Sequence, residues 1–136
     1  MSENVAPLPI RDAYVAISQL DADALVALCD PAVRFESRIT AVEDATYEGH
    51  EGARRYIANI AGAFDQVEVE TSDVVVDRDR AAITNLFRAR GRGSGVQVEE
   101  RFFVAAKGRR GKLLWWGMFD SEPEALEAAG LSDSDS

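Results

Sequence analysis

Residues 95–120 constrain the fold more than any other part of the chain, because they predict two long strands joined by a short basic turn. In GVQVEERFFVAAKGRRGKLLWWGMFD, the even positions from 96 to 106 are apolar except for Glu100, which is typical of a strand with one buried face. If residues 108–112 form the loop, Phe102 faces Met118 and Glu100 faces Asp120. We therefore expect two acids side by side at one end of an apolar wall, unless a bulge turns Asp120 outward.

Two neighbouring tryptophans divide the second of these strands into two faces. Trp115 and Trp116 must point to opposite sides of the sheet. We expect Trp116 to line a pocket, and Trp115 to lie on the outer face with Phe103 and Phe119. An apolar outer face on an otherwise acidic protein predicts a partner that covers it. The expected partner is a second copy of the chain, in a homodimer formed through the outer sheet face.

The rest of the chain predicts helices first and strands afterwards. A turn over residues 91–95 places Arg88 opposite Glu99 and Phe87 opposite Glu100. Helices followed by antiparallel strands predict an α+β, cone-shaped fold, in which three N-terminal helices pack on a strongly curved, mainly antiparallel sheet and a short C-terminal helix follows. Such a sheet encloses a cavity, the default place for a ligand. Helical spacing marks residues 10–17, 21–29, 51–64 and 122–129, strand patterns mark 33–37, 67–76 and 80–92, and residues 38–48 show no clear period.

Size and composition set limits on organisation and partners. The 136 residues predict one domain over 10–131, between a flexible lead-in (1–9) and a disordered acidic tail (132–136). A net charge of −9 argues against nucleic-acid binding, and no apolar stretch is long enough for a membrane span. One cysteine excludes an intrachain disulfide and favours the cytoplasm, and one histidine, His50, excludes a multi-histidine metal site. We expect no metal and no cofactor.

Three segments give the chain a resemblance to a known family. YVAISQLDADALVALCDPAVRFES, YEGHEGARRYIANI and WWGMFD, with this order of elements, resemble the nuclear transport factor 2-like superfamily, and most closely its SnoaL-like and ketosteroid isomerase branch. The resemblance covers about residues 10–131. It implies a homodimer with one apolar pocket in each protomer. The same scaffold supports isomerases, cyclases, dehydratases, hydrolases and proteins without catalysis, so the resemblance alone does not settle activity.

The resemblance also implies candidate acid-base residues. In ketosteroid isomerases a carboxylate on the first strand moves the proton, and by position this is Glu36. The protonated acid that holds the oxyanion corresponds to Glu100, where an apolar site would favour the neutral form. Glu36 is longer than the usual aspartate, and Arg38 follows closely enough to pair with it and hold it ionised.

Two further acid-base positions come from the same comparison. The oxyanion-binding tyrosine corresponds to Ala13 by a count without gaps, and to Tyr14 if the loop between the helices is one residue shorter. In SnoaL-like cyclases an aspartate near the end of the last strand acts as acid or base, and Asp120 holds that position. For Tyr14 a place in the core or pocket wall is the alternative, and for Asp120 a strand-end or capping role.

These residues predict binding of a small, mainly apolar molecule with a carbonyl or hydroxyl group in an enclosed pocket. Catalysis, if present, would be cofactor-independent proton transfer of the isomerase, cyclase or dehydratase type. Asn85 on the pocket wall indicates a polar group part way along the ligand. The alternative is a non-catalytic ligand-binding or dimerisation module, and a third hypothesis is a protein-binding adaptor. The expected ligand-binding residues are Phe35, Tyr56, Ile60, Phe64, Asn85, Phe87, Phe102, Trp116 and Met118.

Overall fold

The computed structural model describes residues 8–37 and 45–131. Its element order is the predicted one of helices followed by strands, with one additional short strand. The expected lead-in through residue 7, Arg38 and the acidic tail after residue 131 lie outside the described residues. The elements are α1 (Ile10–Ser18), α2 (Ala22–Ala27), β1 (Cys29–Ser37), β2 (Ala45–Glu48), α3 (Gly49–Ala63), β3 (Phe64–Asp77), β4 (Arg80–Gly91), β5 (Gln97–Arg109), β6 (Lys112–Phe119) and α4 (Glu122–Ala129).

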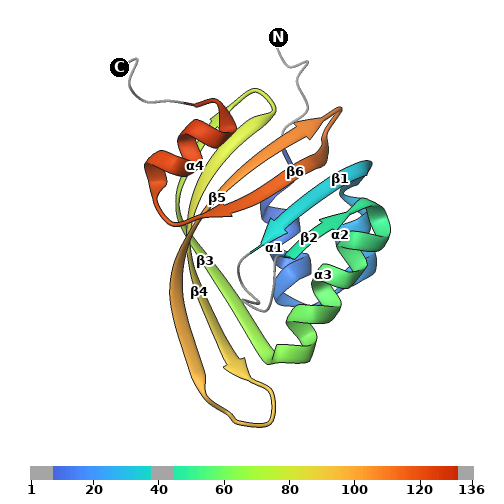
Figure 1. The fold of residues 1–136 in the computed structure, drawn as a ribbon, viewed down its shortest axis with the longest axis vertical. Helices are drawn as coiled ribbons and strands as arrows, with labels where there is room; N and C mark the ends of the chain where they lie inside the picture. The colour runs from blue at the N-terminus through green and yellow to red at the C-terminus, as the bar shows by residue number, and fades with distance from the viewer. Residues whose placement is uncertain (1–7, 38–44, 132–136) are drawn as a thin grey trace.

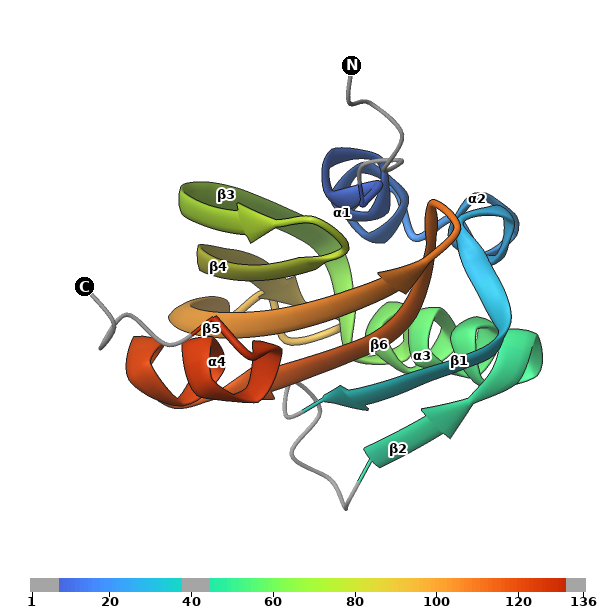
Figure 2. The same cartoon turned by 90° about the horizontal axis from the view of Figure 1, so that it is seen from above.

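The strands form one curved, six-stranded sheet in the order β2-β1-β6-β5-β4-β3. Every neighbouring pair is antiparallel except β1 and β6, which run parallel. The helices α1, α2 and α3 cover the concave face, and α4 lies on the opposite, outer face (Figures 1 and 2). This is the α+β fold predicted from the sequence, with helices packed on a curved sheet and a short C-terminal helix.

Apolar periodicity and local capping account for the helices. In α1, Ala13, Ala16 and Ile17 are buried, which is the apolar stripe predicted from residues 10–17. The side chain of Asp21 accepts a hydrogen bond from the Ala24 amide and caps α2. In α3, Gly52 lies so close to β2 that an added Cβ would approach the backbone of Tyr47 to 2.7 Å. A glycine there allows the helix to pack directly on the strand.

The second helix ends earlier than predicted. The apolar pattern predicted a helix through Cys29, but α2 ends at Ala27 and Cys29 begins β1. The reason is tertiary pairing: the Leu28 carbonyl accepts a hydrogen bond from the Leu113 amide, and Cys29 is the register partner of Leu113. Pairing with β6 therefore draws the chain out of the helix.

The hairpin between β5 and β6 corrects the predicted register. Its turn is only two residues long, Arg110 and Gly111, both with positive φ, and a register shift follows Lys107. Val104 consequently faces Met118, and the expected pairs of Phe102 with Met118 and of Glu100 with Asp120 do not form. Because the offset is two residues, each side chain keeps its predicted face.

The β4–β5 pairing is the predicted one. Arg88 is opposite Glu99 and Phe87 is opposite Glu100. On the outer face, Arg88 Nε donates to Glu99 Oε2 at 2.9 Å and its Nη1 lies 3.2 Å from Glu70 Oε1. The strands β4 and β5 therefore stay paired beyond the end of β6, in the lower part of Figure 1.

The outer face is covered in part by the chain itself. Residues of α4 pack with Ala82 and Ala105 in an apolar cluster separate from the main core, and Phe103, Trp115 and Phe119 pack against this cluster partly buried. The helix α4 therefore covers part of the region around Trp115, and covering of the rest by a partner protomer stays a prediction. Trp116 lies on the opposite side, in the main core.

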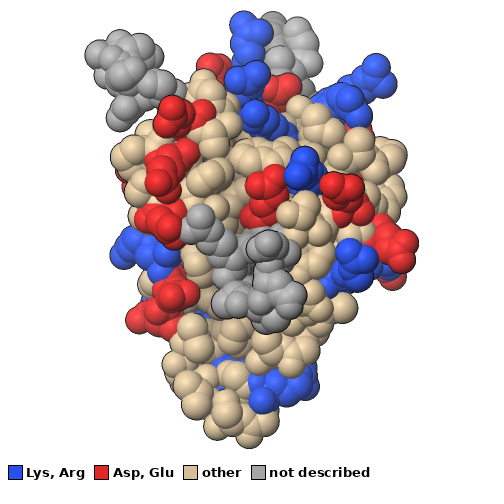
Figure 3. Space-filling model, in the orientation of Figure 1, with Lys and Arg blue, Asp and Glu red and all other residues tan. Residues whose placement is uncertain are grey.

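Acidic and basic side chains are interspersed on the face shown in Figure 3. Several surface charges form ion pairs, such as Arg54 with Asp23 at 2.6 Å and Arg90 with Asp65 at 3.0 Å. None of the described helices has the length and apolar character needed to cross a bilayer.

Candidate functional site

An apolar cavity lies in the core between the helices and the concave face of the sheet. Its volume is about 20 Å³, counted as the space open to the centre of a water molecule, which is enough for about one water. No lining side chain is charged. The lining residues are Tyr14, Ile17, Tyr56, Val69, Asn85, Phe87, Phe102, Val104, Trp116 and Met118, from α1, α3 and β3 to β6.

A chain of three polar side chains crosses one side of this cavity. The Thr71 hydroxyl donates to Asn85 Oδ1 at 3.0 Å, and Asn85 Nδ2 donates to the Tyr14 hydroxyl at 2.5 Å. Asn85 is only 3% exposed, so these bonds satisfy an amide that would be costly to bury alone. The chain joins β3, β4 and α1 across the concave face.

Tyr14 stays in its neutral form. Burial raises the pKa of its hydroxyl far above the ordinary value, against a smaller lowering by the Asn85 hydrogen bond. The phenol is therefore protonated throughout the physiological pH range. It can donate a hydrogen bond, but it cannot act as a base there.

Trp116 forms the centre of the aromatic lining. Its ring is 1% exposed and packs edge to face against Tyr14, with centroids 5.2 Å apart. Within the described residues its indole nitrogen has no hydrogen-bond partner. A buried N–H without a partner costs about 1–3 kcal/mol, so this atom is a site where a further acceptor would add stability.

A larger groove opens next to the cavity, between α1 and β3. Its volume is about 440 Å³ on the same measure. Tyr14 and Val69 line both spaces, so these two side chains separate the groove from the cavity. The groove is lined by Ile10, Arg11, Tyr14, Val15, Ser18, Val69, Thr71 and Val74.

Most of the residues predicted to bind a ligand do line the cavity. These are Tyr56, Asn85, Phe87, Phe102, Trp116 and Met118, together with Tyr14 from the catalytic candidates. Phe35 and Ile60 are fully buried core residues, and Phe64 packs edge to face on Phe87 at 5.6 Å. Sequence reasoning missed three lining residues, Ile17, Val69 and Val104. The sequence pattern could have identified them, since Ile17 lies on the predicted apolar face of a helix and Val69 and Val104 lie on predicted apolar faces of strands.

Glu36 points away from the cavity, which corrects its predicted position. In β1, Phe35 is register partner of Trp116 and faces the core, so Glu36 lies on the outer side with Trp115. Glu36 Oε2 accepts a hydrogen bond from Trp115 Nε1 at 3.4 Å and lies 3.5 Å from Arg34 Nε. The structure thus pairs Glu36 with Arg34, and Arg38, the expected partner, is not described.

The other two carboxylates are exposed and lie apart from each other in the sheet register. Glu100 is opposite Phe87 on β5, in the part of that strand beyond its pairing with β6. Asp120 follows the end of β6, and its amide donates to Glu124 Oε1 at 3.4 Å. The predicted acid pair is therefore not assembled. Within residues 8–37 and 45–131, His, Cys, Asp and Glu side chains form no group of three placed to hold a metal ion.

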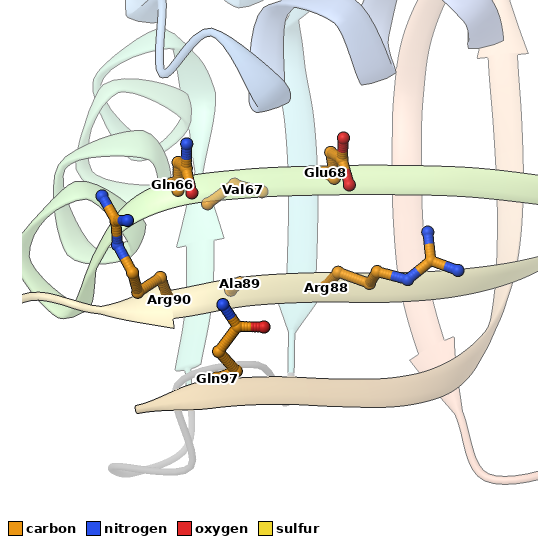
Figure 4. A pocket seen from close by; sticks show the side chains of 7 residues that line it. All are labelled: Gln66, Val67, Glu68, Arg88, Ala89, Arg90 and Gln97. Carbon is orange, nitrogen blue, oxygen red and sulfur yellow. The ribbon is translucent and has the colours of Figure 1, made fainter. Parts of the chain in front are cut away.

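A second hollow, of about 290 Å³, lies on the outer face of β3, β4 and β5 (Figure 4). Gln66, Glu68, Val67, Arg88, Ala89, Arg90 and Gln97 line it. Its two arginines already pair with acids, Arg88 with Glu70 and Glu99 and Arg90 with Asp65. Both arginines are therefore already engaged by acids, and the apolar cavity is the stronger candidate for a ligand site.

Several solved structures share the whole fold. A Catenulispora acidiphila protein with a ketosteroid isomerase-like fold, crystallised with trimethylamine, has a TM-score of 0.74 at 16% identity, over 91% of this chain and 95% of that one. A Mycobacterium tuberculosis protein in complex with estradiol-17beta-hemisuccinate has a TM-score of 0.69 at 13% identity, over 82% and 90%. A candidate SnoaL-like polyketide cyclase from Jannaschia has a TM-score of 0.67 at 19% identity, over 90% and 88%. At these identities the likeness shows the fold alone.

No relative was found among proteins of curated function. The family model of the SnoaL-like domain matches residues 10–119, which include every strand and the three helices of the concave face. This match confirms the resemblance seen in the sequence, and the chain belongs to the SnoaL-like domain family.

Proposed function

We propose that the protein binds a small, uncharged, mainly apolar molecule in the cavity beneath α1, reached through the groove between α1 and β3. The observation that carries this proposal is the cavity lining, which is apolar and uncharged but includes the polar groups of Tyr14, Asn85 and Trp116. A few polar groups in an apolar enclosure are typical of small-molecule sites. Neighbours of the same fold crystallised with small molecules support it.

The small volume of the cavity sets a condition on binding. A space for about one water cannot hold a whole ligand, so most of the ligand must lie in the adjoining groove. Tyr14 and Val69 then have to move apart to join the two spaces. We propose that α1, a helix of nine residues, shifts away from β3 when the ligand enters.

Acid-base catalysis by Glu36, Glu100 or Asp120 stays a prediction from the sequence. Glu36 lies on the outer face, and the other two are exposed and not brought together. Binding without catalysis by these carboxylates is therefore the function that we propose. If turnover of a bound ketone is found, Glu100→Gln is the first variant to test, since Glu100 is opposite Phe87, a cavity residue.

Thermal unfolding with a panel of uncharged steroid, polyketide and terpenoid ketones, alcohols and epoxides tests this function. A compound at 100 times its dissociation constant stabilises the fold by about 2.7 kcal/mol, which raises Tm by roughly 10 °C for a chain of this size. In Val69→Phe the larger ring closes the passage between groove and cavity, so the shift should fall to less than half. Val75→Phe is the matched control, because Val75 lies on the same strand but is exposed on the other face.

Two outcomes would contradict the proposal. If no compound of the panel stabilises the wild-type protein, the proposed ligand binding is wrong. Equal stabilisation of the wild-type, Val69→Phe and Val75→Phe proteins would show that a ligand binds elsewhere. The shift of each variant is measured against its own unliganded Tm, so that any loss of stability from the substitution is removed.

We also propose that the protein forms a homodimer through the outer face beside α4. Phe103, Trp115 and Phe119 remain only partly buried there, which leaves apolar surface for a second copy. A cytoplasmic location belongs to the same proposal, since the one cysteine, Cys29, is a free and buried thiol.

A further inference from the structure

The strand β3 is a long edge of the sheet. Among the described strands it pairs with β4 alone, at the end of the order β2-β1-β6-β5-β4-β3, as Figure 2 shows. Every second residue of an edge strand turns its amide and carbonyl away from its one neighbour, so a further strand can pair there. The edge strand at the other end of the sheet, β2, has four residues, whereas β3 has 14. The edge of β3 is therefore the longer template for an added strand.

The C-terminal end of β3 exposes three consecutive valines. Val74, Val75 and Val76 are 46%, 42% and 52% exposed. Soluble proteins usually protect an edge strand with lysine, proline or a short length, because an apolar edge pairs readily with other chains. Residues 64–77 contain no lysine, arginine, proline or glycine, and residues 73–77 pair with β4 without interruption. An exposed apolar edge of this kind indicates a contact surface.

The two sides of this edge differ in chemistry. Val74 is opposite Ile83 of the main core, so Val74 and Val76 lie on the concave side of the sheet. Val75 is opposite Ala82 of the outer cluster and lies on the outer side. The outer side also carries four acids, which are Glu68, Glu70, Asp73 and Asp77. The edge is therefore apolar on its concave side and acidic on its outer side.

The concave side of the edge borders the groove between α1 and β3. Ile10 and Val15 of α1 line this groove together with Val74 of β3, and Val15 is 47% exposed. Its volume of about 440 Å³ leaves room for apolar side chains of a strand that pairs with the edge. Arg11 is the one charged residue among the described lining residues, and it would repel a lysine placed on this side.

These two sides select the partner. We propose that the edge of β3 binds an extended segment of another protein in which apolar residues alternate with lysine or arginine. Backbone hydrogen bonds hold the segment, its apolar side chains enter the groove, and its cations lie beside the acids of the outer side. A second copy of the chain fits less well, because antiparallel pairing centred on Val75 places Asp73 of each copy opposite Asp77 of the other. This docking site is independent of the proposed ligand, although the two would compete for the groove.

Two fluorescent peptides of the same composition test the alternating pattern. The probe is an eight-residue peptide of alternating lysine and valine, and the control peptide has two lysines followed by two valines, twice. We expect fluorescence anisotropy to show that the wild-type protein binds the alternating peptide at least about tenfold more tightly than the control. Equal affinities would overturn the proposal, because they would show attraction between charges alone.

A substitution in the edge tests the location of the site. Val76→Lys adds a cation to the concave side of the edge, and we expect it to weaken binding of the alternating peptide by at least about tenfold. Val96→Lys is the matched control, because Val96 is 59% exposed in the β4–β5 turn, beside the first residues of β3 and not its last. It should change the affinity by less than about twofold. Equal weakening by the two variants would overturn the location.

The acids of the outer side are tested in the same way. Asp73→Asn with Asp77→Asn should weaken binding of the alternating peptide by about threefold or more. Glu48→Gln with Glu51→Gln removes the same charge beside β2, at the other end of the sheet, and should have less effect. Equal effects of the two pairs would contradict a contact between the cations of the peptide and the acids of β3.

Hydrogen exchange distinguishes an added strand from contact through side chains. Pairing protects the amides that point away from β4, so every second amide from residue 72 to 77 should exchange at least about tenfold more slowly with the alternating peptide bound. Unchanged exchange along this stretch in the complex would overturn strand addition. No binding of the alternating peptide would overturn the docking site and leave the proposed binding of a small molecule unaffected.

Discussion

Cys29 is a buried thiol whose reactivity depends on the fold. Burial raises the pKa of Cys29 to about 12, while Lys112 lowers it and Asp30 raises it by smaller amounts. The thiolate is the reacting species. We expect Ellman's reagent at pH 8 to label the native protein at least about a hundredfold more slowly than the urea-unfolded protein, where the pKa of the thiol is the ordinary 9.0. Comparable rates in the two states would contradict burial of this thiol.

The same thiol gives a pH dependence of stability with a defined sign. Its pKa is higher in the folded chain than the ordinary 9.0, so its contribution is complete below pH 9 and is lost as pH rises towards 12. The loss is on the order of 1.4 kcal/mol per pH unit at most. Urea unfolding at pH 8, 10 and 11 should show this loss of stability above pH 9 in the wild-type protein, and a smaller loss in Cys29→Ala. The same dependence of the unfolding free energy on pH in the wild-type protein and in Cys29→Ala would contradict a contribution from this thiol.

The positions of two neighbouring residues show where sequence reasoning succeeded and where it failed. Phe35 and Glu36 were both predicted to face the pocket, although adjacent strand residues point to opposite sides. The structure assigns the inward position to Phe35. Asn85 was correctly predicted to line the cavity from its parity. Its partners Thr71 and Tyr14 could not be predicted, because they lie on two other elements whose approach depends on the whole fold.

At the scale of elements, Arg92 joins the β4–β5 turn to the end of α3. Its Nε donates to the Ala61 carbonyl at 2.8 Å, and Nη2 donates to the Phe64 carbonyl at 3.4 Å. A cation at a helix C-terminus also interacts favourably with the helix dipole. We expect Arg92→Ala to lower the free energy of unfolding by about 1 kcal/mol. Urea unfolding measures this, and amide hydrogen exchange should accelerate in the last turn of α3.

An exposed arginine on β5 provides the control for this prediction. Arg101→Ala should change the free energy of unfolding by less than about 0.5 kcal/mol, as surface substitutions usually do. Equal effects of Arg92→Ala and Arg101→Ala would show that Arg92 contributes charge alone and no specific cap.

The β5–β6 hairpin shows why faces were easier to predict than register. The period of two fixed which side chains share a face, so Val104, Trp116 and Met118 were correctly placed together. The register depended on the turn, and the sequence pattern did not show that Arg110 adopts positive φ in a two-residue turn. The short edge strand β2 was also missed, since four residues show too little period.

At the scale of the whole molecule, the proposed homodimer is tested by replacing a partly buried residue of the outer face. Phe119→Glu places a charge among apolar side chains, and we expect it to weaken the dimer by more than about tenfold. Val74→Glu is the control, because Val74 is exposed at the groove on the concave side. Sedimentation equilibrium measures the association. A monomeric wild-type protein at 100 μM would remove the dimer proposal.

The fold as a whole was predictable because many residues contribute to its pattern, whereas the site depends on few. Dozens of alternating positions in β3 to β6 support the same α+β arrangement, so one error of register did not change it. The acid pair of Glu100 and Asp120 depended on a single register, and it was lost when that register differed.

The two tryptophans point to opposite faces of β6, so the intrinsic fluorescence of the protein can report on each face. Trp116 emits from the enclosed interior and Trp115 from the half-covered exterior, so each face has its own fluorophore. With Trp115 replaced by Phe, intrinsic emission reports the ligand cavity alone. With Trp116 replaced by Phe, it reports the surface around α4. Occupancy and assembly can then be followed separately in unlabelled protein.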